Sequence, residues 1–270
     1  MGMEAMKFNP DSVVKHIVQW LLSYAQESRQ KGWVIGVSGG IDSAVTSALC
    51  GLTGLPTTVV ELPIHQHPDE VNRAVEHMDA LCHRFPLVEQ RRVDLTSVYD
   101  AFADSIPKDQ DASEGLALIN ARARLRMTTL YTIAAQRQSL VVGTGNKVED
   151  FGVGFYTKYG DGGVDLSPIA DLMKTEVFAL GAFLDVPKSI QSAAPTDGLW
   201  GDDRTDEMQI GATYPELEWA MEHVGKAKNG WSPRQVEVME IYQRLHLANQ
   251  HKMHPIPVCH IPDAVRLVSS

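Results

Sequence analysis

The sequence lacks the features of a secreted or membrane-spanning protein. Its three cysteines, Cys50, Cys82 and Cys259, lie far apart and form no Cys-x-x-Cys pair. An odd and dispersed set of cysteines argues against a disulfide framework and for a reducing compartment. No apolar run approaches the roughly 18 residues that a membrane-spanning helix needs, and residues 1–10 show no basic flank followed by an apolar core. We therefore expect a cytoplasmic protein that spans no membrane.

The chain is also short of positive charge. It has 24 Lys and Arg residues against 34 Asp and Glu residues, which gives a formal net charge of −10. Nucleic-acid-binding proteins usually carry a basic surface, because contacts to phosphates supply much of their affinity. Arg122, Arg124 and Arg126 could still form a local basic patch. The overall balance nevertheless argues against nucleic acid as a partner.

The order of apolar and helical patterns predicts an α/β fold. The chain has 270 residues, which suits one large domain or two small ones, and we interpret residues 1–270 as a single domain. Short apolar runs alternate with helical periodicity, which is typical of a doubly wound parallel sheet flanked by helices, the Rossmann-like class. Expected strands cover residues 33–38, 57–62, 92–95 and 139–144, and expected helices cover 13–22, 41–50, 69–83, 97–104, 114–137, 172–184 and 187–193.

Two stretches have no sustained periodicity. Residues 145–165 are crowded with glycine, and residues 194–205 are also irregular. A loop of about 20 residues inside a compact domain is usually functional or disordered. We therefore expect residues 145–163 to form a lid over a site.

The segment from Ser38 to Ser43 has the chemistry of an anion site. It follows an expected buried strand and begins an expected helix, and ligands bind at this end of parallel strands. Gly39 and Gly40 allow the backbone to approach a ligand, and the helix N-terminus favours negative charge. Asp42 would repel bound phosphates unless a cation lies between them. A bridging Mg²⁺ resolves this conflict.

Several other interpretations of this segment were weighed. It lacks the lysine of a Walker loop, and it does not match the Gly-x-Gly-x-x-Gly fingerprint of dinucleotide-binding folds. Residues 36–40 do match the Gly-x-Ser-x-Gly elbow of α/β-hydrolases. That elbow needs an oxyanion loop after an earlier strand, and little but one expected helix precedes Ser38. A glycine-rich turn that only packs remains the structural alternative.

At Ser38–Ser43 (SGGIDS) the sequence resembles the PP-loop ATP pyrophosphatase superfamily, and further motifs resemble the ammonia-dependent NAD synthetases within it. These motifs follow in order along the chain, from about residue 34 to residue 255. They are residues 120–127 (NARARLRM), 143–149 (GTGNKVE), 157–161 (TKYGD), Asp165, Lys174, Pro195-Thr196, Asp206-Glu207 and His251-Lys252. One such motif would be a weak signal, whereas the ordered series is specific.

The resemblance implies a reaction and its partners. Deamido-NAD⁺, ATP and ammonia would give NAD⁺, AMP and pyrophosphate, through an adenylated nicotinate carboxylate. ATP would be a co-substrate with Mg²⁺, and the protein would act as a homodimer with deamido-NAD⁺ near the subunit boundary. Glutamine-dependent relatives carry an additional amidase domain that 270 residues cannot hold, so free ammonia is the expected nitrogen source. Because ammonia competes with water for the intermediate, the site must exclude water.

The resemblance also implies roles for individual residues. Asp42 and Glu149 would bind Mg²⁺, Thr144 would contact adenosine, and Lys174 and Thr196 would contact phosphate oxygens. Asp161 would share the second substrate's site or guide ammonia. The implied deamido-NAD⁺ site comprises Arg124, Lys158, Asp165, His251 and Lys252. The implied ATP site comprises Gly36, Val37, Ser38, Gly39, Gly40, Ile41, Asp42, Ser43, Thr144, Lys174 and Thr196.

Each assignment has a simpler alternative. Arg122 and Arg126 are interpreted as surface residues in helix ion pairs, and Glu149 could be a solvated loop carboxylate. His246, His251, His254, Cys259 and His260 could suggest zinc, but their spacing fits no usual zinc pattern. Asp197 stands where the family usually has a small residue, which puts the role of Thr196 in doubt. Other enzymes of the superfamily are the nearest competing functions: RNA-thiolating members would favour basic surfaces and paired cysteines, and the GMP synthetase and asparagine synthetase types lack the TKYGD and HK segments. A nucleotide-binding sensor without catalysis is a competing function of a different class, and the two expected metal carboxylates argue against it.

Overall fold

The computed structural model describes residues 8–107, 114–196, 205–227 and 229–266. At its centre lies a four-stranded sheet in the order β3-β2-β1-β4, and every strand pair is parallel. The strands are β1 (Trp33–Gly36), β2 (Thr57–Glu61), β3 (Val88–Arg92) and β4 (Leu140–Val141). In β1 and β2, Val34 and Val60 belong to one hydrophobic core and Ile35 and Val59 to another. This alternation shows that both faces of the sheet are covered.

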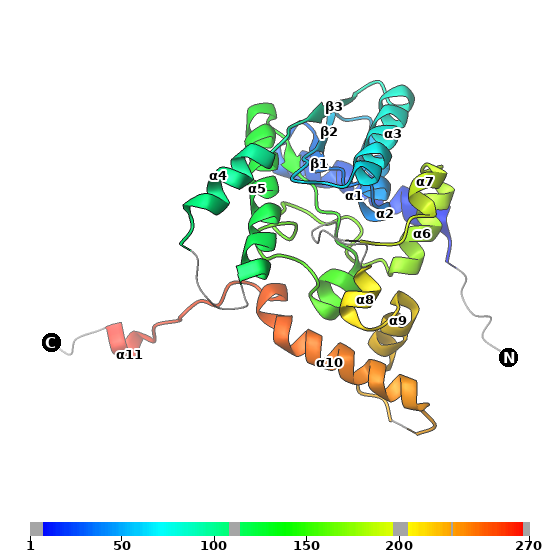
Figure 1. The fold of residues 1–270 in the computed structure, drawn as a ribbon, viewed down its shortest axis with the longest axis vertical. Coiled ribbons are helices and arrows are strands. Elements are labelled where there is room, and N and C mark those ends of the chain that lie inside the picture. The colour runs from blue at the N-terminus through cyan, green and yellow to red at the C-terminus, as the bar shows by residue number, and fades with distance from the viewer. Residues whose placement is uncertain (1–7, 108–113, 197–204, 228, 267–270) are drawn as a thin grey trace.

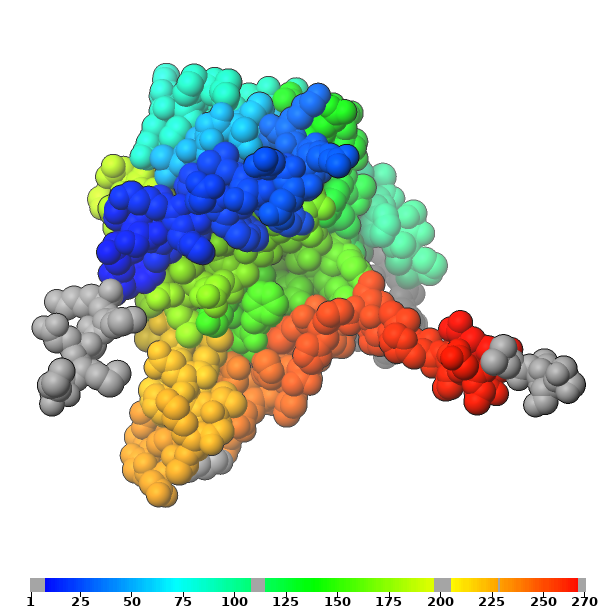
Figure 2. All heavy atoms as spheres, turned by 180° about the vertical axis from the view of Figure 1, so that it is seen from behind, coloured from blue at the N-terminus to red at the C-terminus, as the bar shows by residue number. Residues whose placement is uncertain are grey.

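Helices cover the two faces unequally (Figure 1). On one face lie α1 (Pro10–Ser28), α2 (Ile41–Leu52), α3 (Pro68–Arg84), α6 (Lys174–Phe183) and α7 (Lys188–Gln191). On the other face lie α4 (Thr96–Ser105) and α5 (Glu114–Arg137). Figure 2 shows α1 lying across the outside of this arrangement. The doubly wound parallel α/β fold expected from the sequence is therefore confirmed.

A second group of helices packs around its own core below the sheet (Figure 1). It consists of the π-helix η1 (Lys147–Val153), α8 (Asp206–Ile210), α9 (Tyr214–His223) and α10 (Pro233–Met253). Val148 and Val153 of η1 are buried here with Leu217 of α9 and Met239 of α10. The short α11 (Asp263–Arg266) lies beyond α10, in an exposed segment that leaves the main body.

The strand order creates a switch point beside β1. After β1 the chain moves outward through β2 and β3, and it then returns to place β4 on the opposite side of β1. The loops that follow β1 and β4 therefore diverge to opposite faces and leave a crevice between them. Ser38–Ser43 follows β1 and Thr144–Asn146 follows β4, so two separate motifs meet at this crevice.

Three sequence-based expectations need correction. The third strand covers Val88–Arg92 instead of residues 92–95. The apolar pattern missed it because its side chains are mostly polar and exposed at the sheet edge. The fourth strand is only Leu140–Val141, extended by a bridge between Val142 and Leu166. Residues 145–165 are not irregular throughout, because η1 occupies Lys147–Val153 and buries Val148 and Val153. In the described part of the chain, no helix has the length and apolar character needed to cross a membrane.

One buried histidine should make the fold sensitive to acid. His77 of α3 is 2% exposed, and its Nε2 lies 2.9 Å from Ser47 Oγ on α2. Burial lowers the pKa of His77 to about 4 from its usual 6.5. Protonation of His77 is therefore less favourable in the folded state than in the unfolded state. The contribution of neutral His77 to the free energy of unfolding is fully present above pH 6.5 and is lost as the pH falls from about 6.5 to about 4.

We expect the free energy of unfolding to fall by about 2 kcal/mol between pH 7 and pH 5 through His77 alone. Urea unfolding at both pH values measures this loss. His77→Gln cannot ionise, so its stability should change less over the same interval. An equal pH dependence in both proteins would show that His77 is not the titrating group.

Candidate functional site

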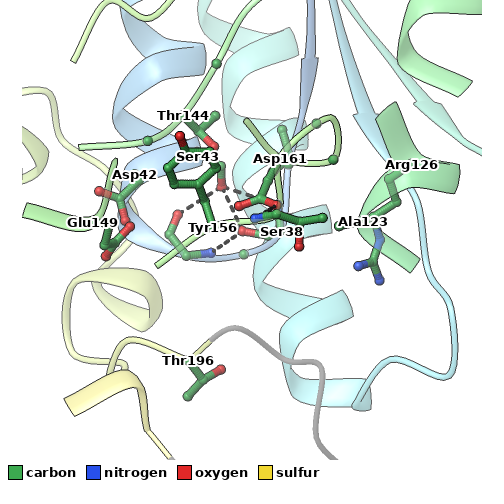
Figure 3. Close-up of a pocket in the computed structure, with 18 of the residues that line it drawn as sticks. Ser38, Asp42, Ser43, Ala123, Arg126, Thr144, Glu149, Tyr156, Asp161 and Thr196 are labelled. Atoms are coloured by element: carbon green, nitrogen blue, oxygen red, sulfur yellow. Dashed lines mark hydrogen bonds between the residues drawn. The ribbon is translucent and has the colours of Figure 1, made fainter. Parts of the chain in front are cut away.

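A cavity of about 560 Å³ lies at the carboxyl end of the sheet, at the switch point. Its walls come from the loops after β1, β2 and β4, from α5, and from the segment around η1. Figure 3 shows Asp42 and Glu149 beside each other, whereas Arg126 lies on the opposite side of Ser38. The cavity thus joins sequence motifs that lie more than 100 residues apart.

The loop after β1 holds its shape through its own serines. Ser43 Oγ donates to Gly40 O at 3.0 Å and accepts from the Ser38 backbone N–H at 3.2 Å. Gly39 has a φ of 84°, and a Cβ there would lie 2.5 Å from Glu70 O. Gly40 caps α2 without a side-chain hydrogen bond. The first N–H groups of α2 therefore face the cavity with no side-chain cap, which suits an anion.

Asp42 and Glu149 converge on one ammonium group. Lys174 Nζ lies 2.5 Å from Asp42 Oδ2 and 2.8 Å from Glu149 Oε1. The side chains of Lys174, Asp42 and Glu149 are 3%, 17% and 16% exposed, so Glu149 is not a solvated loop carboxylate. Burial alone would lower the Lys174 pKa, but Asp42 and Glu149 outweigh it and raise this pKa. Burial opposes ionisation of Glu149, yet Lys174 holds the Glu149 pKa below its usual value.

Two further residues support this charge cluster. Asn146 donates from Nδ2 to Asp42 Oδ1 at 3.0 Å, and its Oδ1 accepts from the N–H groups of Val148 and Glu149. Tyr214 donates to Glu149 Oε1 at 2.6 Å, and its ring centre lies 4.8 Å from Lys174 Nζ. Sequence reasoning missed both roles. Asn146 stands three residues before an acidic residue, a helix-capping signal, whereas nothing local marks Tyr214.

The carboxylate pair fits a magnesium ion. Both carboxylates approach a single cationic position, and Mg²⁺ is usually held by one or two carboxylates together with phosphate oxygens and water. Within the described ranges, no three His, Cys, Asp or Glu side chains gather into a metal site that the protein could complete alone. The residues therefore fit a metal whose coordination a phosphate ligand completes.

Several residues expected to hold the second substrate lie together. Arg124 Nε donates to Lys158 O at 3.3 Å, and Lys158 Nζ donates to His251 O at 2.7 Å. Lys252 donates to Gly154 O and to Tyr156 O, and its side chain lines the cavity. α5, the segment after η1 and the end of α10 thus meet at one edge of the cavity.

Asp161 and Asp165 have different surroundings. Asp161 lines the cavity and accepts the Thr157 N–H at 2.9 Å, and burial raises its pKa. Asp165 lies outside the cavity, where it accepts from Tyr131 Oη at 3.0 Å and from the Val141 N–H at 2.8 Å. It lines a separate hollow of about 660 Å³ beside Arg29 and Lys31. Asp165 therefore does not share the cavity with Asp161 and Lys252, and Arg124, Lys158 and His251 are likewise absent from its lining.

The remaining predicted residues line the cavity from other sides. Thr144 follows β4, and Thr196 Oγ1 donates to Glu70 Oε1 at 2.9 Å. Asp197, which bears on the role of Thr196, lies outside the described residues.

The interpretation of Arg126 as a surface ion-pair residue is wrong. It lines the cavity, donates to Leu62 O at 2.9 Å and to Gln66 Oε1 at 2.8 Å, and burial lowers its pKa to about 10. Arg122 instead stacks over the Tyr99 ring, with its guanidinium carbon 4.9 Å from the ring centre.

Known proteins are similar to this chain in sequence and in fold. A family model described as NAD synthase matches residues 13–255. The NH(3)-dependent NAD(+) synthetase of Alkaliphilus metalliredigens is 38% identical over 250 residues, which cover 90% of this chain and 97% of that protein. The structure of NMN synthetase from Francisella tularensis has a TM-score of 0.82 at 34% identity, and covers 94% of this chain and 100% of its own. The NH3-dependent NAD synthetase of Campylobacter jejuni has a TM-score of 0.75 at 22% identity, with the same coverage.

Asn146 both caps η1 and holds Asp42 in place, so its side chain should contribute to the stability of the folded protein. Asn146→Ala removes the cap of η1 and the donor to Asp42, so we expect a loss of about 1–3 kcal/mol in the free energy of unfolding. Asn249→Ala is the matched control, because it removes one amide hydrogen bond to Val153 O, at the other end of η1. Urea denaturation should show the smaller loss for Asn249→Ala, of about 1 kcal/mol. Equal losses would argue against the special role of Asn146.

Proposed function

This chain belongs to the NAD synthase family of ATP-dependent carbon–nitrogen ligases, and we propose that it converts deamido-NAD⁺, ATP and ammonia into NAD⁺, AMP and pyrophosphate. The observation that carries the proposal is the meeting of Ser38–Ser43 with the Asp42–Glu149 pair in one cavity. An uncapped helix N-terminus beside paired carboxylates suits a metal-bound polyphosphate better than a free anion. The named relative that covers most of the chain supplies the substrate class.

The reaction has two transfers. A carboxylate oxygen of the nicotinate attacks the α-phosphorus of ATP, and the bond to pyrophosphate breaks. Ammonia then attacks the carbonyl carbon of this mixed anhydride, AMP leaves with the carboxylate oxygen, and a proton is released. Adenylation is needed because a carboxylate oxygen leaves poorly by itself. Water would hydrolyse the same anhydride, so amide formation requires that the bound substrates exclude water from the cavity.

The ATP site would use the loop after β1 and residues around it. The backbone and hydroxyl groups of Ser38–Ser43 would bind the pyrophosphate part, while Lys174 and Thr196 would contact phosphate oxygens. Such donors stabilise the charge that develops as the phosphate bond breaks. Thr144, at the end of β4, would contact the adenosine part. The position of Thr144 across the switch point supports this role, because it faces the cavity from the other side of β1.

Asp42 and Glu149 would hold Mg²⁺. When bound, this ion neutralises phosphate charge and orients the α-phosphate for attack. Asn146 and Tyr214 would fix the two carboxylates, since each donates a hydrogen bond to one of them. These hydrogen bonds would keep the two carboxylates in place when the metal ion binds between them or leaves.

The second substrate would extend beyond the cavity. Arg124, Lys158, His251 and Lys252 would bind deamido-NAD⁺ at the cavity edge, and Asp161 would lie near the entering ammonia. Asp165 lines a separate hollow on the surface beside Arg29 and Lys31. In a homodimer this separation would be natural, because a dinucleotide at the subunit boundary could reach both regions. Residues 1–270 would form a single domain in each protomer.

The direct test supplies ATP, Mg²⁺, ammonium and deamido-NAD⁺ and measures AMP and NAD⁺. We expect the two products in equal amounts, and AMP formation should depend on the acid substrate. Tight ATP binding with no AMP would instead support a nucleotide-binding sensor. AMP formation with a different acid, but not with deamido-NAD⁺, would assign the chain to another ligase activity.

Asp42→Asn should lower kcat/KM for ATP by roughly 100-fold, because the metal would lose one of its two protein carboxylates. Asp171→Asn is the control, since Asp171 is exposed and pairs with Lys147 at the surface. Steady-state kinetics at saturating Mg²⁺ measure both variants. Unchanged turnover in Asp42→Asn would remove Asp42 from the metal site.

A second candidate substrate is the mononucleotide acid whose amide is NMN. The observation that favours it is the structural similarity to an NMN synthetase, at 34% identity over 94% of this chain. Both acids carry the same nicotinate carboxylate, so the chemistry and the ATP site would be unchanged. The ratio of kcat/KM for the two acids decides between them. A higher value for the mononucleotide would replace deamido-NAD⁺ as the substrate while leaving the ligase assignment intact.

A further inference from the structure

Lys174 occupies the cationic position between the two carboxylates assigned to the metal. We propose that Lys174 is a resident cation, which holds this position in the nucleotide-free protein and gives it up only when metal and nucleotide arrive together. The inference rests on the proposed function, because it takes Asp42 and Glu149 as metal ligands. It adds a coupling between metal binding and nucleotide binding that neither the fold nor the reaction requires.

The ammonium and a metal cannot share this position. Lys174 Nζ already contacts Asp42 Oδ2 at 2.5 Å and Glu149 Oε1 at 2.8 Å. A magnesium ion must approach carboxylate oxygens to about 2.0–2.1 Å, and Asp42 Oδ1 already accepts from Asn146. An ammonium and a divalent cation on the same oxygens would repel each other strongly in a buried site. Metal binding therefore requires the side chain of Lys174 to leave.

The two carboxylates are the main groups that favour Lys174 in its present place. It is the first residue of α6, and a cation at a helix N-terminus is disfavoured by the helix dipole. Its side chain is 3% exposed, so water does little to stabilise the charge. The Tyr214 ring contributes a contact at 4.8 Å. Once a metal neutralises Asp42 and Glu149, the ammonium loses its main partners and needs another anion.

A bound nucleotide supplies that anion. Lys174 lines the same cavity as Ser38–Ser43, where the phosphates would bind. Its side chain has four flexible carbons, so the ammonium can turn from the carboxylates to a phosphate oxygen. Metal alone would displace Lys174 without offering its ammonium a new partner. With nucleotide alone, Lys174 would reach a phosphate only by leaving Asp42 and Glu149 without a cation. Each ligand therefore improves the site for the other, and this coupling must be reciprocal.

The test measures Mn²⁺ binding to the nucleotide-free protein by electron paramagnetic resonance. Mn²⁺ is the probe because it takes the same oxygen ligands as Mg²⁺ and can be observed directly. Removing the resident cation in Lys174→Met should tighten Mn²⁺ binding by at least about tenfold, within the usual range of coupling between sites. Lys147→Met is the charge-matched control, because Lys147 lies on η1 but pairs with exposed Asp171. It should bind Mn²⁺ like the unmodified protein.

Two further variants separate the possible outcomes. Lys174→Arg retains a cation and should bind Mn²⁺ as weakly as the unmodified protein. Asp42→Asn combined with Lys174→Met should lose the tight binding. If Lys174→Met binds Mn²⁺ tightly whether or not Asp42 is present, the metal assignment of the proposed function fails. If Lys174→Met and the unmodified protein bind Mn²⁺ equally through Asp42, the metal site stands and the resident-cation inference is overturned.

The measurement does not depend on a fully stable variant. Lys174→Met leaves two buried carboxylates uncompensated, so its melting temperature should fall without metal and rise again with Mn²⁺. Lys174→Gln keeps a polar side chain without the charge and provides a second neutral variant. Its Mn²⁺ affinity should also exceed that of the unmodified protein. No gain in affinity in this folded variant would contradict the inference.

The nucleotide dependence gives an independent readout. Binding of α,β-methylene-ATP, which cannot be cleaved between the α- and β-phosphates, is measured by calorimetry with and without Mn²⁺. In the unmodified protein Mn²⁺ should strengthen nucleotide binding about 5- to 150-fold. In Lys174→Gln this factor should shrink, because no cation has to move. An unchanged factor would show that the coupling does not pass through Lys174.

Discussion

The pairing of Lys174 with Asp42 and Glu149 is the interaction on which the rest of the site depends. The three charges come from α6, α2 and η1, elements that are distant in sequence, and all three side chains are largely removed from water. Burying one such charge without its partners would cost several kcal/mol. The cluster is therefore stable only when α2, η1 and α6 are all packed in place.

The sheet provides the place where those elements can meet. Because β4 joins β1 on the side opposite β2, the loops after β1 and β4 separate and leave room for a ligand. Ser38–Ser43 and Asn146 stand on the two sides of this opening, and Asn146 reaches across it to Asp42. Capping a helix and orienting a carboxylate are thus performed by one amide side chain.

Local patterns in the sequence predicted the elements whose residues serve the core on their own. The apolar runs of β1 and β2 and the helix α5 are of this kind. The loop at Ser38–Ser43 was predicted from its own glycines and hydroxyl groups, whereas Arg124, Lys158 and His251 were named only because the sequence resembles the ammonia-dependent NAD synthetases. The bounds of β3 could not be predicted, because its exposed residues carry little apolar signal and its pairing with β2 defines them. η1 is marked locally only by the capping signal of Asn146, and the position of Tyr214 depends on packing between distant helices, which no short window of sequence reveals. Arg126 was misjudged because a cation in a helical run resembles a surface residue until its burial is known.

The two hydrophobic cores have a consequence for how this chain tolerates change. Asp42 and Lys174 belong to elements packed on the sheet, whereas Glu149 and Tyr214 belong to the smaller helical core. The distance between the two carboxylates therefore depends on how the two cores pack against each other. Volume changes at Val148, Leu217 or Met239 would alter that packing. Residues that do not line the cavity thus influence the distance between the two carboxylates. Substitutions in the helical core are therefore expected to change the site as much as substitutions in its motifs.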